Sequence, residues 1–130
     1  MRLLTVQHAL EIHKTLAPNQ HLKHGGEHLL ASALSRPSTS YADHQLYAGL
    51  FEKAAALLEG ITQNHPFTDG NKRTAYTCTV LFLRLNGWTI NPMVTDRQQA
   101  EFVVRVADHS LPFKSIVSQL EDWAVPHSRI

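Results

Sequence analysis

The sequence predicts an all-α fold, a compact bundle of about six helices with a central buried helix and a short extended flap. Three observations support this prediction. Apolar residues recur at helical spacing along most of the chain. Proline and glycine interrupt this spacing at intervals that suit one helix each. One segment is apolar nearly all round, which is typical of a helix buried at the centre of a domain.

The first half of the chain is expected to hold three helices and the flap. The first helix stops at Pro18, and the Gly25-Gly26 pair forms a turn before the second. The third is the longest, and Pro66 prevents its continuation. These helices are expected at residues 5–17, 27–34 and 46–64. Between the second and third, a proline, small hydroxyl residues and an aromatic suit an exposed extended flap made of Pro37, Ser38, Thr39, Ser40 and Tyr41.

The second half is expected to hold three more helices. The segment that is apolar nearly all round lies at 71–86 and ends at Asn86-Gly87 in a left-handed cap. Residues 88–90 form a short extended piece. Thr95 or Asp96 caps a helix that reaches about residue 109. The last helix spans 112–125 with Pro112 in its first turn.

Composition narrows the class of protein. The 130 residues suit one domain, 1–130, and the net charge of +1 comes from interspersed charges without the basic stripe of a nucleic-acid binder. No apolar run approaches the length of a membrane span, and the first residues do not resemble a signal peptide. The single cysteine, Cys78, suits a reducing compartment, so a cytoplasmic location is expected. The nine histidines follow no metal-ligand spacing, and most are expected at the surface.

The segment Gly70-Asn71-Lys72-Arg73 is the first candidate for chemistry, because a helix begins there. The first N–H groups of a helix have no partner within it, and the helix dipole adds positive potential. Gly70 allows a tight turn and a close approach of an anion, Asn71 adds an amide donor, and Lys72 and Arg73 add two cations. Together these residues predict a phosphate-binding site.

Two residues just before this helix supply reactive groups. Asp69 suits a magnesium ligand whose other ligands are phosphates and water. His65 can lose a proton near neutral pH and so can act as a general base. Pro66 and Phe67 are expected to stiffen the loop and anchor it in the core. A turn followed by a charged helix cap explains the same spacing equally well, so the residues alone leave both readings open.

The run His65-Pro66-Phe67-Thr68-Asp69-Gly70-Asn71-Lys72-Arg73-Thr74-Ala75 resembles the signature of the Fic/Doc superfamily in its Doc (death-on-curing) form. Residues 51–58 and 81–87 on either side, and 32–37 before the flap, resemble Doc proteins as well. The resemblance extends from about residue 29 to residue 90. It implies a Fic/Doc-type helical bundle.

The resemblance also implies an activity. Fic enzymes that transfer AMP usually have glycine where this chain has Lys72, and arginine where it has Tyr76. Doc proteins share the lysine and phosphorylate elongation factor Tu. The resemblance therefore implies a toxin that transfers the γ-phosphate of ATP to a threonine or serine hydroxyl of a protein and blocks translation. AMP or other nucleotidyl transfer, and a catalytically silent binding module, remain the alternatives.

Roles follow by position from the resemblance. His65 would be the catalytic base, Asp69 would hold Mg²⁺, and Arg73 would stabilise the charge that develops during transfer. Gly70, Asn71, Lys72 and Arg73 would bind phosphates, and the flap of Pro37 to Tyr41 would dock the target as an added strand.

Two departures from related chains bear on regulation. The loop after Gly25-Gly26 is shorter than in many Doc-like chains, which affects target choice or the position of the flap. The inhibitory helix motif of some Fic proteins is absent, since Ala55 stands where serine or threonine is required before Glu59-Gly60. The resemblance therefore implies an antitoxin in trans, of the Phd type, whose disordered tail folds onto the toxin.

Overall fold

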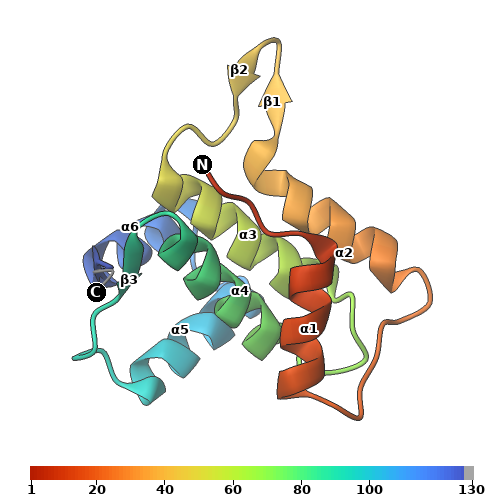
Figure 1. Ribbon diagram of the computed structural model, residues 1–130. Coiled ribbons are helices and arrows are strands. Elements are labelled where there is room, and N and C mark those ends of the chain that lie inside the picture. Colours follow the sequence, from red (N-terminus) through yellow and green to blue (C-terminus); the bar gives the residue numbers. More distant parts are fainter. Residues whose placement is uncertain (128–130) are drawn as a thin grey trace.

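Six α-helices make up most of the chain in the computed structural model, which describes residues 1–127 (Figure 1). The helices are α1 Val6–Leu16, α2 Gly26–Ser35, α3 Leu50–Asn64, α4 Asn71–Leu85, α5 Asp96–Ala107 and α6 Phe113–Trp123. The prediction of an all-α bundle with about six helices is confirmed. None of the helices in residues 1–127 combines the length and the apolar character needed to cross a membrane.

The helix at the centre of the bundle is α3. Its residues from Lys53 to Leu58 are buried without interruption, because α2, α4, α5 and α6 all pack against it. Three of them, Ala54, Ala55 and Ala56, are small enough to let the neighbouring helices approach closely. The sequence had instead indicated 71–86 as the central helix. The position of the central helix was therefore predicted wrongly, because α4 buries one face and exposes Lys72 and Arg73 on another.

Local sequence signals set most helix ends. Thr95 caps α5 with a reciprocal capping box to Gln98, as predicted. The last helix ends at Trp123, earlier than expected, because residues Ala124–Pro126 form strand β4 and pair antiparallel with β3, Trp88–Ile90. The extended piece at 88–90 is thus confirmed, and its partner strand is new. Pro112 precedes α6 as its N-cap and does not lie within the first turn.

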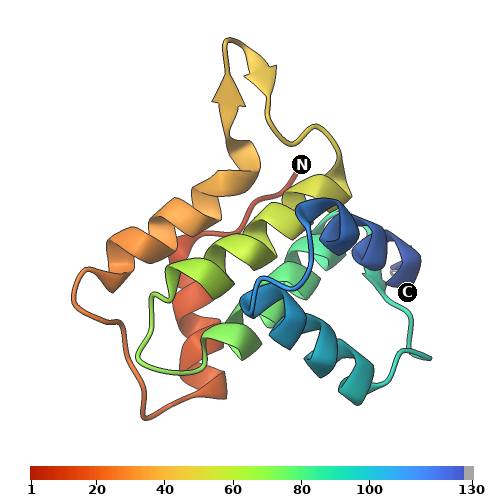
Figure 2. The ribbon, with the colours of Figure 1, turned by 180° about the vertical axis from the view of Figure 1, so that it is seen from behind.

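The expected flap is a short hairpin that projects from one end of the helical body (Figures 1 and 2). Strands β1, Ser40–Tyr41, and β2, His44–Gln45, are joined by Ala42 and Asp43. Both connecting residues have positive φ, 50° and 66°, as two-residue hairpin turns require. The start of the flap was predicted wrongly. Pro37 and Ser38 belong to a 3-10 helix, η1 Arg36–Ser38, and Pro37 is buried.

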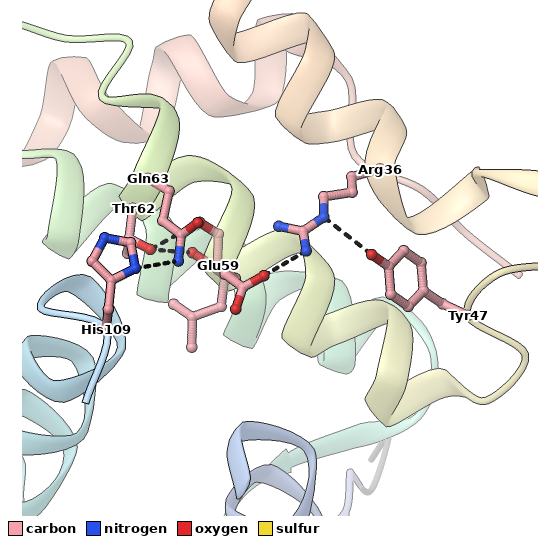
Figure 3. A network of polar contacts seen from close by, with 7 residues as sticks. Arg36, Tyr47, Glu59, Thr62, Gln63 and His109 are labelled. Carbon is pink, nitrogen blue, oxygen red and sulfur yellow. Dashed lines mark hydrogen bonds and ion pairs between the residues drawn. The ribbon is translucent and has the colours of Figure 1, made fainter. Parts of the chain in front are cut away.

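A polar network fixes the base of this hairpin to α3. The buried Lys53 donates from Nζ to the carbonyl oxygens of Pro37 at 3.1 Å and Tyr47 at 2.5 Å, and to Oε1 of Gln45 at 2.7 Å. Close by, Arg36 bonds the Tyr47 hydroxyl at 3.2 Å and forms an ion pair with Glu59 at 2.5 Å (Figure 3). Two-stranded hairpins are marginal alone, so these contacts hold this one in place.

Candidate active site

The loop of residues 65–70 joins the end of α3 to the start of α4 and carries the sequence signature. His65 is the C-cap of α3 and lies in the left-handed region, with φ 50° and ψ 56°. Its side chain is exposed. A residue other than glycine in this region carries a cost of roughly 1–2 kcal/mol. The strained residue of this loop is therefore the one expected to act as the base.

The side chain of Asn71 closes the loop from inside. Asn71 is buried, its Oδ1 accepts from the Phe67 N–H at 3.0 Å, and its Nδ2 donates to the Phe67 carbonyl at 2.9 Å. Its remaining amide hydrogen faces Nδ1 of His65 at 3.4 Å. The side chain thus has no free donor for a phosphate, which differs from the role expected of it. At the helix start, Asn71 can offer its backbone N–H.

Helix α1 supports the second half of the loop. The ring of His13 stacks on that of Phe67, with centroids 3.6 Å apart, and its Nε2 lies 2.8 Å from the carbonyl oxygen of Asp69. Gly70 has φ 80°, and a Cβ there would lie 3.0 Å from Cβ of Ala17. The sequence pattern had explained Gly70 by a tight turn and by the approach of an anion. The positive φ agrees with the turn, and the structure adds a further reason, because the missing side chain leaves room for Ala17 at the end of α1.

The segment before α2 supports the first half of the loop. The N–H of Thr68 donates to the His21 carbonyl at 2.8 Å, and the N–H of Lys23 donates to the Pro66 carbonyl at 2.9 Å. Phe67 is 1% exposed, which confirms that it anchors the loop in the core. Backbone bonds on one side and α1 on the other hold the loop in one shape. The side chains of His65 and Asp69 therefore project from a rigid backbone.

The start of α4 concentrates positive potential. Its N-cap, Gly70, has no side chain to accept a hydrogen bond. Among the described residues of α4, the first backbone N–H that bonds a carbonyl is that of Thr74, which donates to Gly70 at 3.0 Å. Lys72 and Arg73 are exposed and take part in neither of the two ion pairs found in that part of the chain. Two cations and unpaired N–H groups at a helix start favour a bound anion such as phosphate.

The contact between His65 and Asn71 bears on the state of the imidazole. Because Nδ2 of Asn71 can only donate, Nδ1 of His65 must accept, and a neutral ring then carries its proton on Nε2. A base that acts through Nε2 needs the other tautomer. At 3.4 Å the contact is long and weak. A small rotation of the exposed ring would therefore free either nitrogen for a substrate.

The donor set at Asp69 fits a magnesium ion held mainly by a nucleotide. Its carboxylate is exposed and makes no hydrogen bond or ion pair with residues 1–127. The same part of the chain holds no group of three or more histidine, cysteine, aspartate or glutamate side chains suited to a metal. Mg²⁺ is commonly bound by one or two carboxylates with phosphates and water as the other ligands. One carboxylate beside the expected phosphate site matches that pattern.

Comparisons with known proteins agree with the geometry of this loop. The model of the Fic/DOC family matches residues 3–83. The chain is 33% identical over 96 residues to the protein named Toxin Doc of Mycolicibacterium smegmatis (strain ATCC 700084 / mc(2)155), which is 74% of each chain. The chain belongs to the Fic/DOC family. The matched residues include both the signature loop and the helix α1 that supports it.

A groove beside the Fic/DOC loop lies between α1, α4 and α5. It has a volume of about 650 Å³, and most of its wall is apolar. Its lining residues include Leu16, Tyr76, Val103 and Val104, with Lys72 and Arg73 at its border. Tyr76 donates to Gln99 at 2.6 Å, and burial raises its pKa. The two cations of the helix start thus border both the loop and the groove.

The structure brings the signature residues together but keeps the hairpin apart from them. The hairpin adjoins the first turn of α3, whereas His65 caps its last turn. At the usual rise per residue, the two ends of the 15-residue α3 lie about 22 Å apart. Thr39, Ser40 and Tyr41 belong to the segment that is fixed near the first of these ends, and His65 lies at the other. Their docking role stays a prediction, and it concerns a different part of the target.

One residue of the site was missed from sequence. It is His13, which lies on the inner face of α1 four residues after Ala9, and both are buried. That spacing was the available signal. The contact itself could not be foreseen, because its partner is a backbone carbonyl 56 residues further along the chain.

Proposed function

We propose that this protein is the toxin of a toxin–antitoxin system and transfers the γ-phosphate of ATP to a serine or threonine hydroxyl of a protein. Elongation factor Tu is the candidate target. Membership of the Fic/DOC family and the similarity to a protein named Toxin Doc support the general function. The finer choice of phosphate over AMP rests on one observation, the position and exposure of Lys72.

Lys72 is the second residue of α4, between Asn71 and Arg73, and its side chain is exposed beside the loop. A cation at the positive end of a helix is unfavourable unless an anion is bound there. A glycine at this position, as in AMP-transferring relatives, would leave room for a diphosphate. A lysine fills that room and adds charge, which supports a terminal phosphate held near Asp69 and Arg73.

The proposed step is an in-line displacement at phosphorus. The acceptor oxygen bonds to the γ-phosphorus while the bond from that phosphorus to the bridging oxygen of the β-phosphate breaks, and ADP leaves. His65 takes the proton of the acceptor hydroxyl. A magnesium ion held by Asp69 would neutralise charge on the phosphate oxygens. Lys72, Arg73 and the free N–H groups of α4 orient the γ-phosphate, since positioning and electrostatics supply most of the catalysis in such reactions.

The two proposed partners, an antitoxin and the target protein, would bind to the groove and to the hairpin. An antitoxin of the Phd type would fold a segment into the groove between α1, α4 and α5, and it would cover Lys72 and Arg73. An acidic residue in that segment would compensate these two cations. The hairpin would bind the target by strand addition beyond the first turn of α3, the end opposite His65, using an exposed edge and Tyr41, which is 81% exposed.

One labelling experiment tests the reaction. The protein is incubated with Mg²⁺, purified elongation factor Tu or a bacterial extract, and ATP labelled at the α- or the γ-phosphate. We expect label in protein from the γ position, and none when His65→Ala replaces the wild type. Label from the α position would show that the protein transfers AMP, and it would overturn the proposed phosphorylation. If neither position labels a protein, the remaining hypothesis is a binding module without transfer activity.

A further inference from the structure

His13 differs from every other histidine of the chain. All nine histidines lie within residues 1–127, and eight are exposed, whereas His13 is 3% exposed. It lies in α1, outside the signature, next to the loop that carries Asp69. A polar ring in a buried position needs a partner, because burying an unpaired polar group is costly.

The partner of His13 is the peptide that leads into α4. Nε2 lies 2.8 Å from the carbonyl oxygen of Asp69. Because a carbonyl can only accept, Nε2 must carry a hydrogen. The ring planes of His13 and Phe67 differ by 6° at a centroid distance of 3.6 Å, so the imidazole is fixed in orientation as well. A Cβ on Gly70 would lie 3.4 Å from the same Nε2.

This bond has a particular place among the contacts of the loop. The bonds from His21, Lys23 and Asn71 hold residues 66–68. Among the hydrogen bonds of residues 1–127, the one from His13 is the bond that holds Asp69. It holds the peptide between Asp69 and Gly70, which adjoins both the Cα that carries the Asp69 carboxylate and the start of α4.

We propose that His13 is a positioning residue of the active site, which orients the Asp69 carboxylate and the start of α4 through the Asp69–Gly70 peptide. Groups that orient a metal-binding side chain typically change metal affinity by about 10–100-fold when they are removed. The bond between His13 and the Asp69 carbonyl is seen in the structure. Its effect on nucleotide binding rests on the proposed function.

Two variants separate the bond from the packing. His13→Phe keeps an aromatic ring that can stack on Phe67 but removes the donor, and His13→Gln keeps an N–H donor at about the same reach. His24→Phe, at an exposed position, is the matched control. Hydrogen exchange at the Thr74 amide, which bonds to Gly70, reports on the start of α4. Calorimetry of ATP binding at varied Mg²⁺, without any protein target, reports on Asp69.

The expected result is specific to the lost donor. In His13→Phe, exchange at the Thr74 amide rises several-fold relative to His24→Phe. The Mg²⁺ concentration that half-saturates ATP binding rises by roughly tenfold. His13→Gln restores both values towards the wild type. Unchanged Mg²⁺ dependence in His13→Phe overturns the proposal, even if exchange rises, because the bond would then serve folding alone.

The proposed function can fail separately. If the wild type binds no ATP, the phosphotransfer proposal is lost, and exchange at the Thr74 amide becomes the deciding measurement. Faster exchange in His13→Phe than in His13→Gln then supports the part of the proposal that concerns the start of α4. Equal exchange in both variants overturns it.

Discussion

The side chain of Asn71 bonds both backbone polar groups of Phe67, accepting from its N–H at 3.0 Å and donating to its carbonyl at 2.9 Å. Both residues are buried, so water cannot replace either bond. We expect Asn71→Ala to lower the free energy of unfolding by about 2–4 kcal/mol, because each orphaned buried group costs roughly 1–3 kcal/mol. Urea denaturation measures this. Thr77→Ala, at an exposed position of the same helix, should change little, and a similar loss in both variants would contradict the role of Asn71.

The hairpin depends on the buried ammonium group of Lys53. Lys53→Met keeps the length of the side chain but leaves the carbonyls of Pro37 and Tyr47 without their donor. We expect faster hydrogen exchange at the Leu46 amide, which bonds to Thr39 across the hairpin, and a loss of about 1–3 kcal/mol in unfolding free energy. Lys114→Met at an exposed position is the control. Unaltered exchange at the Leu46 amide would show that the hairpin is stable without the hydrogen bonds from Lys53.

Lys72 should destabilise the free protein and stabilise the nucleotide complex. Its charge lies at the positive end of α4 and has no ion-pair partner in residues 1–127. Lys72→Gln is therefore expected to raise the unfolding free energy by about 0.5 kcal/mol at low salt and to weaken ATP binding. Thermal melts with and without Mg²⁺ and ATP test both effects. The control is Lys114→Gln, which changes an exposed lysine at the second residue of α6, and ATP stabilising Lys72→Gln as much as wild type would refute the phosphate role.

Alkaline pH should reveal the burial of Cys78. Burial raises the pKa of this thiol from 9.0 to about 12. In the native state the thiol stays protonated up to that pH, whereas in the unfolded chain it ionises near pH 9. The stabilising effect is therefore complete below pH 9 and is lost as pH rises towards 12, by about 1.4 kcal/mol per pH unit. Denaturation at pH 8 to 10 should show a flatter pH dependence in Cys78→Ala than in the wild type.

Local signals predicted the helices and the signature loop because their causes lie within a few residues. The Thr95 cap is an example, since its reciprocal bonds to Gln98 lie within three residues of the chain. Contacts between distant segments were not predicted. Strand β4 is three residues long and directly follows a helix, and only its pairing with β3 makes it a strand.

The position of the hairpin relative to the active site could not be predicted from the sequence either. The resemblance gave the flap a docking role without placing it relative to the catalytic loop, because the sequence does not show how α2 packs on α3. The antiparallel packing of α2 on α3 brings Gly26 to Pro66 and Arg36 to Glu59. The hairpin that follows α2 is therefore carried to the end of α3 opposite His65.

His65 offers a test of strain against activity. It adopts φ 50°, where glycine has no steric cost, and its side chain is exposed with one weak contact to Asn71. We expect His65→Gly to raise the unfolding free energy by about 0.5–1 kcal/mol while abolishing transfer and growth inhibition. His65→Ala should abolish both without the gain, because alanine keeps the strained Cβ. Urea denaturation of the two variants, paired with the labelling assay, separates the effects. A glycine variant no more stable than the alanine variant would mean that the loop holds His65 without strain, and surviving growth inhibition in either would remove His65 from the mechanism.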